Sequence, residues 1–238
     1  MPESLSPLPE HVERGQAVYR RLLEVYGLPQ WRNTLPPLDE LISTILSQNT
    51  NDRNRDLAFQ RLRERFPTWE AVRDAPAEAV IEAIRPAGLG NQKGPRIQQV
   101  LRQISAECGS LDLSFLQHWP AEKALAWLMR FQGVGPKTAA IVLVFSLNKP
   151  AFPVDTHIYR VSGRIGLRPA HLSVEQAHQY LAGVFKPDQY APGHLNLIRL
   201  GRETCHARRP NCPACPVNGL CQFYLTGSGS VPASTGGR

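Results

Sequence analysis

The stretch Phe-Gln-Gly-Val-Gly-Pro-Lys-Thr-Ala-Ala, residues 131–140, constrains the fold of this chain more than any other. It follows an amphipathic segment, residues 120–130, and leads into an apolar run, so its two glycines are expected in a turn between two helices. Gly133 and Gly135 tolerate positive φ angles and leave the backbone uncovered. Pro136 has the φ angle of a first helical residue. The pattern predicts a helix-hairpin-helix.

Such a turn can bind an anion, because the free backbone N–H groups at a helix N-terminus lie at the positive end of the helix dipole. The chain has 27 Lys and Arg residues against 20 Asp and Glu residues, a formal net charge of +7. This excess of positive charge favours a polyanionic partner. We therefore expect Gly133 and Gly135 to contact a DNA phosphate.

Two residues near the turn have side chains suited to catalysis. Lys137 lies in the first turn of the second helix, where a cation is unfavourable. Its amine is a candidate nucleophile, although a lysine beside such a turn is more often a further phosphate contact. Asp155, in Val-Asp-Thr-His, precedes a helical pattern, and an Asp in that position is most often a helix N-cap.

Four of the five cysteines share one short C-terminal loop with the spacing Cys-x6-Cys-x2-Cys-x5-Cys: Cys205, Cys212, Cys215 and Cys221. Four cysteines hold either zinc or a [4Fe-4S] cluster, and the ligand count leaves both open. Zinc ribbons usually carry two Cys-x2-Cys pairs, whereas this loop has one. Arg208 and Arg209 lie between the first two ligands, where they form a short basic loop that is expected to contact phosphates or solvent.

Hydrophobic periodicity predicts helices with few convincing strands, so the expected fold class is all-α. The predicted helices are residues 9–26, 38–46, 52–66, 69–73, 77–84, a helix starting near Pro95, and residues 120–130, 155–166, 174–184 and 189–203. In the second helix an apolar stripe should face the core: Leu41, Ile42, Ile45 and Leu46. Asp52 is expected to cap the third helix.

The remaining composition bounds the class of protein. No stretch is apolar enough for a signal peptide or a membrane span, so a cytoplasmic, nucleoid-associated protein without a membrane partner is expected. Cys108, outside the cysteine loop, is expected to be a small apolar residue. Residues 226–238, rich in Gly, Ser and Thr, suggest a flexible tail.

Two of these motifs together, Gly-Val-Gly-Pro-Lys-Thr-Ala and Val-Asp-Thr-His-Ile-Tyr-Arg-Val-Ser-Gly-Arg, closely resemble the endonuclease III family of base-excision DNA glycosylases. The resemblance extends with gaps over residues 18–224 and includes the cysteine spacing. It implies a six-helix domain, residues 30–149, and an iron–sulfur domain built from residues 1–29 and 150–225. It implies that the four cysteines bind a [4Fe-4S] cluster.

The same resemblance implies what the residues do. Lys137 and Asp155 would be the catalytic pair of a glycosylase and abasic-site lyase that removes oxidised pyrimidines through a Schiff base and β-elimination. Gln48 would fill the space left by a flipped nucleotide, and Leu89 would be a wedge between bases. Without the resemblance, they would be a polar residue at a helix end and a buried leucine. The partner would be double-stranded DNA with a damaged base or an abasic site, bound by a monomer.

The chain departs from the family pattern at several positions. The family usually has Leu-Pro-Gly-Val-Gly-Arg-Lys where this chain has Phe-Gln-Gly-Val-Gly-Pro-Lys, so Pro136 removes a cation next to the nucleophile. Asn49 replaces an Ala after the glutamine, and Gly90 replaces an aromatic residue after Leu89. These departures bear on base preference and catalytic strength.

Three alternatives stay open at this point. A mismatch adenine glycosylase would share the hairpin and the cluster, but that family generally lacks the lysine and carries an extra C-terminal domain. A non-catalytic DNA-binding protein would need the hairpin alone, and a ferredoxin-like electron carrier would need only the cluster.

Overall fold

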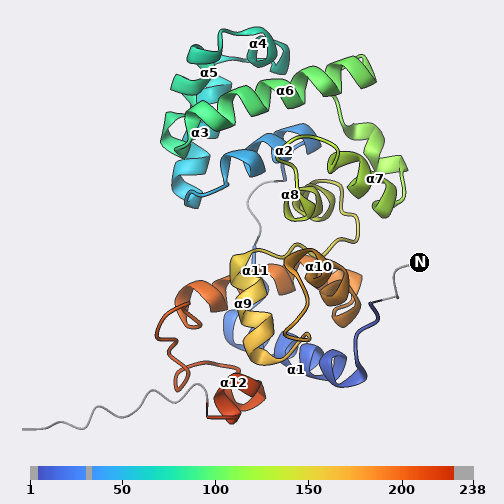
Figure 1. The fold of residues 1–238 in the computed structure, drawn as a ribbon, viewed down its shortest axis with the longest axis vertical. Coiled ribbons are helices and arrows are strands. Elements are labelled where there is room, and N and C mark those ends of the chain that lie inside the picture. The colour runs from blue at the N-terminus through green and yellow to red at the C-terminus, as the bar shows by residue number, and fades with distance from the viewer. Residues whose placement is uncertain (1–4, 31–33, 228–238) are drawn as a thin grey trace, which may run out of the picture. The chain divides into compact units, whose positions relative to one another are not determined.

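The computed structural model describes residues 5–30 and 34–227 (Figure 1). Within these residues every regular element is a helix, which confirms the all-α prediction. The chain folds into two compact units. We call residues 32–149 the hairpin unit and residues 1–31 and 150–238 the cysteine unit. Most of the predicted flexible tail, residues 228–238, lies outside the described residues.

The hairpin unit is a bundle built around a buried helix, α2. Leu41, Ile42, Ile45 and Leu46 of this helix are fully buried, as the apolar stripe predicts. Around it pack α3, α6, α8 and the segment η3. The elements of the unit are α2 (Pro37–Leu46), α3 (Asp52–Arg65), α4 (Trp69–Asp74), α5 (Ala77–Ala83), η1 (Arg85–Ala87), α6 (Gly90–Cys108), η2 (Ser114–His118), α7 (Ala121–Leu128), α8 (Pro136–Ile141) and η3 (Val142–Ser146).

Helix α6 runs along the hairpin unit, with α4 and α5 packed on one side and α2 on the other (Figure 1). It starts at Gly90, so the prediction of a start near Pro95 is wrong. Pro95 is the sixth residue of the helix and removes the N–H that would bond to the carbonyl oxygen of Asn91. The five residues before it are already helical, and Leu89 is the N-cap.

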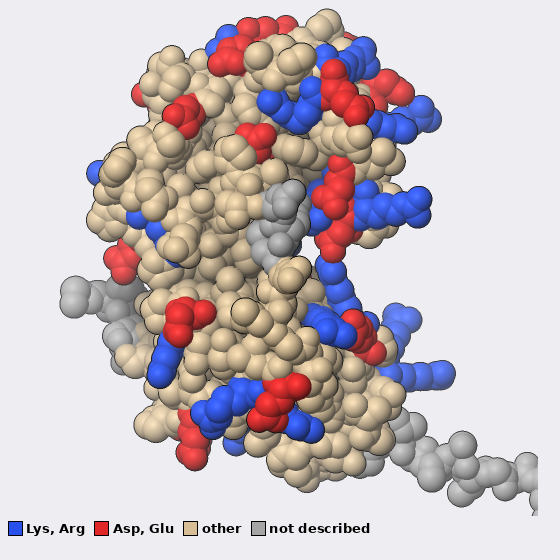
Figure 2. All heavy atoms as spheres, turned by 180° about the vertical axis from the view of Figure 1, so that it is seen from behind, with Lys and Arg blue, Asp and Glu red and all other residues tan. Residues whose placement is uncertain are grey.

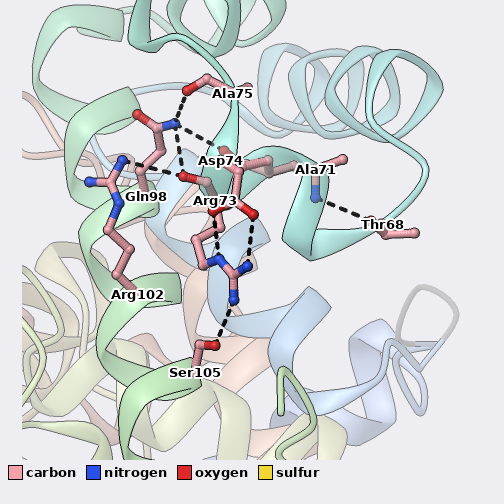
Figure 3. Close-up of polar contacts among 9 residues, drawn as sticks. Thr68, Ala71, Arg73, Asp74, Ala75, Gln98, Arg102 and Ser105 are labelled. Carbon is pink, nitrogen blue, oxygen red and sulfur yellow. Dashed lines mark hydrogen bonds and ion pairs between the residues drawn. The ribbon is translucent and has the colours of Figure 1, made fainter. Parts of the chain in front are cut away.

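Polar contacts fix α4 against α6 (Figure 3). Gln98 of α6 donates to the carbonyl oxygens of Val72, at 3.0 Å, and Ala75, at 2.8 Å. Arg73 pairs with Asp74 and donates to the Ser105 hydroxyl at 2.6 Å. The two bonds from Gln98 satisfy carbonyl groups at the C-terminus of α4 that the helix itself leaves unpaired.

The cap of α3 also differs from the prediction. The N-cap is Asn51, whose side chain accepts the N–H of Asn54 at 2.9 Å. Asp52, the predicted cap, is the first helical residue and forms an ion pair with Arg55. Both residue types suit a helix N-terminus, one as a cap and the other in the first turn, so the sequence alone leaves a shift of one position open.

The cysteine unit joins the N-terminal helix to the C-terminal third of the chain. Its elements are α1 (Pro9–Tyr26), α9 (Thr156–Ile165), α10 (Val174–Val184), η4 (Pro187–Gln189), α11 (Tyr190–Glu203), η5 (Asn218–Leu220) and α12 (Gln222–Leu225). Helix α11 packs on α9, while α1 contacts α10 and α11. In the part of the chain that the structure describes, no helix has the length and apolar character needed to cross a membrane.

Candidate functional site

The hairpin turn lies between α7 and α8 and rests on an aromatic residue. Phe131 is 2% exposed and packs edge-on against Trp127, with 4.8 Å between ring centroids. Gly133 has a φ of 80°, a conformation that favours glycine. Gly135 has φ −93° and ψ −179°, which any residue can adopt, and a Cβ atom there would meet nothing within 4 Å. The interior of the protein therefore does not require a glycine at position 135.

Lys137 is the second residue of α8, directly after the turn, and it is half-buried. Among the described residues, none forms a hydrogen bond or an ion pair with its amine. Helix α8 continues into η3, which has the wider π-helical hydrogen bonding, a feature frequent at functional sites. The backbone of Lys137 is thus fixed by α8, while no described residue bonds to its amine.

The structure brings Gln48 to the hairpin turn. Its Nε2 atom donates to the carbonyl oxygen of Gly133 at 3.0 Å, and its Oε1 atom accepts from Arg96 at 3.1 Å. Asn49 follows with a φ of 54°, in the left-handed region. Asn tolerates this conformation better than most residues, which accounts for an Asn at this position.

Leu89 is exposed at the start of α6, so the alternative of a buried leucine is excluded. It is 46% exposed and has a φ of 52°, a strained conformation for a leucine. Lys93, four residues later in α6, is only 1% exposed. The Nζ atom of Lys93 donates to the carbonyl oxygens of Leu46, at 2.8 Å, and Ala87, at 2.9 Å. One buried ammonium group therefore joins the backbone two residues before Gln48 to the backbone two residues before Leu89.

Asp155 is the N-cap of α9 in the cysteine unit. One carboxylate oxygen accepts the N–H of Ile158 at 2.8 Å, and the side chain is half-buried. The structural reading of this residue as a cap is therefore correct. A cap uses one oxygen, so the residue retains a second oxygen and its negative charge.

The four cysteines of the C-terminal loop line a common pocket in the cysteine unit, together with Arg164, Leu200 and Val217. Arg164 donates to the Cys205 sulfur at 3.4 Å. Burial raises the pKa of the Cys215 thiol to about 11. No three His, Cys, Asp or Glu side chains of the described residues are grouped closely enough to hold a single metal ion.

The basic loop between Cys205 and Cys212 is anchored by two arginines of α9. Arg164 donates to the carbonyl oxygens of His206, at 2.7 Å, and Ala207, at 2.9 Å. Arg160 donates to the carbonyl oxygen of Cys205 at 3.0 Å. The side chains of Arg208 and Arg209 in this loop are exposed.

Sequence reasoning assigned no role to four of these residues: Lys93, Arg96, Arg160 and Arg164. The two arginines of α9 are four residues apart and therefore share one face of the helix, a signal that the sequence contained. Lys93 and Arg96 are three residues apart on α6 and both contact the segment around Gln48. Their partners are far away in sequence, so only the folded chain brings them together.

On the face of each unit drawn in Figure 2, basic and acidic side chains are interspersed. Ion pairs between neighbouring surface residues occur in both units, for example Arg73 with Asp74 in the hairpin unit and Arg199 with Glu203 in the cysteine unit. A carboxylate beside a cation lowers the positive potential in its immediate vicinity. DNA contacts should therefore depend on those cations that have no acidic neighbour.

The comparison with family models matches residues 42–187 to the HhH-GPD superfamily of base excision DNA repair proteins. The match includes the hairpin turn, Lys137 and Asp155. The chain belongs to this family.

Within it, the endonuclease III proteins are the relevant relatives. The chain is 34% identical to endonuclease III of Sulfolobus acidocaldarius over 187 residues, 78% of this chain and 81% of that protein. It is 31% identical to endonuclease III of Thermotoga maritima over 208 residues, 87% of this chain and 93% of that protein. The resemblance inferred from the motifs is thus confirmed over most of the chain.

Solved structures give the same result. A trapped covalent intermediate of an endonuclease III with DNA superposes with a TM-score of 0.78 at 26% identity, over 91% of this chain and 98% of that one. A thermostable thymine-DNA glycosylase superposes with a TM-score of 0.76 at 20% identity, over 90% of this chain and 98% of that one, and so shares the fold.

Proposed function

We propose that the protein is a bifunctional DNA glycosylase and abasic-site lyase of the endonuclease III type, acting on oxidised pyrimidines in double-stranded DNA as a monomer associated with the nucleoid. The observation that carries the proposal is the position of Lys137 immediately after the hairpin turn, where no described residue bonds to its amine. A water-activating glycosylase would not need an amine there. A lyase does, because the amine must form a covalent bond with the sugar.

The reaction follows from the chemistry of an amine nucleophile. The damaged nucleotide leaves the base stack, since its sugar carbon cannot be reached inside the duplex. The neutral amine of Lys137 attacks C1′, the bond from C1′ to the base breaks, and the base leaves with the bonding electron pair and takes up a proton. The sugar ring opens to give a Schiff base between C1′ and Nζ. Loss of a C2′ proton then breaks the 3′ carbon–oxygen bond and nicks the strand.

Asp155 supports this reaction through its charge. By the family resemblance, its carboxylate stabilises the positive charge that develops on the sugar and helps to remove the proton of the lysine. The capping bond to Ile158 fixes the carboxylate and leaves one oxygen for this role. We assign Gln48 and Leu89 to the flipped-out site as plug and wedge, and Gly133, Gly135, Arg208 and Arg209 to phosphate contacts.

The cysteine pocket suits a [4Fe-4S] cluster. In a cubane each cysteine binds a different iron, so four sulfurs can line one pocket without converging on a point. Zinc would require the four sulfurs to converge on one ion. Cys205, Cys212, Cys215 and Cys221 would hold the cluster, which would connect both ends of the basic loop. The loop's own arginines would then meet the DNA backbone.

The test is a strand-cleavage assay on duplexes that carry thymine glycol, an abasic site or no lesion. We expect base release and nicking 3′ to the lesion for the first, nicking for the second and neither for the third. Release of the base without nicking would indicate a monofunctional glycosylase and would overturn the lyase assignment.

A further inference from the structure

Arg96 of α6 lies directly against the hairpin turn. A Cβ atom added to Gly133 would lie 2.4 Å from Cδ, 2.6 Å from Nε and 3.0 Å from Cζ of Arg96. The guanidinium group therefore fills the space that any side chain at position 133 would occupy. Gly133 serves two purposes: it permits the positive φ of the turn, and it lets a cation from another helix approach the backbone.

Hydrogen bonds fix this position. Arg96 donates from one terminal nitrogen to Oε1 of Gln48, which in turn donates to the carbonyl oxygen of Gly133. A guanidinium group has five N–H donors, and this bond uses one of them. The remaining donors lie beside Gln48 and Gly133, two residues that the proposed function already assigns to DNA.

Among the described residues, no carboxylate pairs with Arg96. Several arginines of the hairpin unit have acidic partners, for example Arg55 with Asp52 and Asp56, and Arg130 with Glu107. Within the described ranges, 5–30 and 34–227, no ion pair joins Arg96 to a carboxylate. Burial and, to a lesser extent, the charge of Arg96 lower the pKa of the neighbouring Lys93.

We propose that Arg96 is the DNA-positioning cation of the hairpin, and that its guanidinium binds a phosphate of the strand held by the turn. This rests on the proposed function. Endonuclease III relatives usually carry an arginine at the position of Pro136, the first residue of α8. Here a proline occupies that position, and the cation comes from a different helix, α6.

The test compares Arg96→Gln with Arg102→Gln, a matched variant that removes the same charge from the same helix. Arg102 is exposed, and among the described residues its hydrogen bond goes to the carbonyl oxygen of Arg73, at 3.3 Å (Figure 3). Affinity for a duplex with a tetrahydrofuran abasic analogue is measured from 50 to 300 mM salt. Each phosphate contact contributes about 0.9 to the slope of log affinity against log salt.

For Arg96→Gln we expect a slope shallower by about 0.9 and roughly tenfold weaker binding at the lowest salt concentration. Arg102→Gln should keep the wild-type slope, and Arg96→Lys should restore it because the charge returns. A residue that only supported Gln48 would not change the salt slope. Equal slopes for Arg96→Gln, Arg102→Gln and the wild type would overturn the proposal.

A second measurement uses the unmodified protein and does not depend on how the variants fold. Phenylglyoxal modifies exposed arginines, and mass spectrometry locates the products. We expect bound duplex to protect Arg96 and to leave Arg102 reactive; equal reactivity of Arg96 with and without DNA would contradict the phosphate contact. If the wild-type protein neither binds nor nicks an abasic duplex, the proposed function fails and this inference fails with it. Normal nicking with unprotected Arg96 overturns the inference alone.

Discussion

The Nζ atom of Lys93 lies 2.8 Å from the carbonyl oxygen of Leu46, the last residue of the core helix α2. The same atom lies 2.9 Å from the carbonyl oxygen of Ala87. Leu46 is two residues before Gln48 and Ala87 is two residues before Leu89. The ammonium group thus holds together the two segments that carry the proposed plug and wedge, at a site closed to solvent.

Lys93→Met should destabilise the hairpin unit and alter its pH dependence. Burial, with a smaller contribution from Arg96, lowers the pKa of Lys93 to about 8. In an unfolded chain the pKa is about 10.4, so the unfolded chain binds more protons between these values. The free energy of unfolding of the wild type should therefore rise, relative to that of Lys93→Met, as the pH increases from about 8 to about 10.4.

This prediction can be checked by urea unfolding followed by tryptophan fluorescence. The three tryptophans in the described residues, Trp69, Trp119 and Trp127, all belong to the hairpin unit. At pH 7 the variant should lose about 1–3 kcal/mol for each carbonyl group left without a donor, less the charge burial that it avoids. Stability curves for the two proteins that stay parallel from pH 7 to pH 10 would show that Lys93 keeps an ordinary pKa.

Asp155→Asn distinguishes the role of Asp155 as the N-cap of α9 from its proposed role in catalysis. Asn is as good an N-cap as Asp, so the free energy of unfolding should change by less than ~0.5 kcal/mol. Base excision in single-turnover assays should fall by about 100-fold, because the negative charge is lost. Ser173→Ala is the matched control: it removes the cap of α10 in the same unit, costs ~1 kcal/mol, and should leave excision unchanged. Full activity of Asp155→Asn would reduce Asp155 to its capping role.

The purified protein should contain about four irons per chain, because four cysteine ligands satisfy one cubane. Cys212→Ser should lower the iron content and weaken DNA binding, whereas Cys108→Ser, in the hairpin unit, should change neither. Iron is measured by mass spectrometry and the cluster by its broad visible absorption. Stoichiometric zinc in protein made under iron-replete, anaerobic conditions would contradict the cluster assignment.

Gln48→Ala and Leu89→Ala should slow cleavage of a thymine glycol duplex more than cleavage of an abasic duplex. Extruding a stacked base costs a few kcal/mol, and plug and wedge offset part of that cost, while an abasic site has little stacking to break. Leu57→Ala provides a control, since Leu57 is a leucine on α3 with similar exposure, 39% against 46% for Leu89. Equal losses of cleavage rate on both substrates would show that Gln48 and Leu89 have structural roles only.

The sequence predicted much of the fold because most helices have local signals. The apolar stripe of α2, the limits of α1 at Pro9 and Tyr26, and those of α10 at Val174 and Val184 agree with the structure. The start of α6 was misplaced because proline is usually a first-turn residue, and here a left-handed leucine precedes five helical residues. The left-handed conformation of Leu89 cannot be read from local sequence.

The parts of the site that depend on the spacing of residues along the sequence, the hairpin turn and the cysteine loop, could be predicted. It was not predictable where the contacts join distant segments. The bond between Gln48 and Gly133 spans 85 residues, and the bond between Arg164 and Ala207 spans 43. Likewise, the loss of a cation at Pro136 is visible in the sequence, but the approach of Arg96 to the turn is a property of the fold.

The central claim, that Lys137 is the nucleophile, is tested most directly by borohydride trapping on an abasic-site duplex, with the covalent peptide identified by mass spectrometry. Borohydride reduces a Schiff base to a stable amine, so the DNA fragment marks the residue that attacked. We predict one adduct, on Lys137, in the wild-type protein. Lys137→Ala should give none while its DNA affinity changes little, since it loses one of several backbone contacts. An adduct on another amine, or an adduct that persists in Lys137→Ala, would contradict the account.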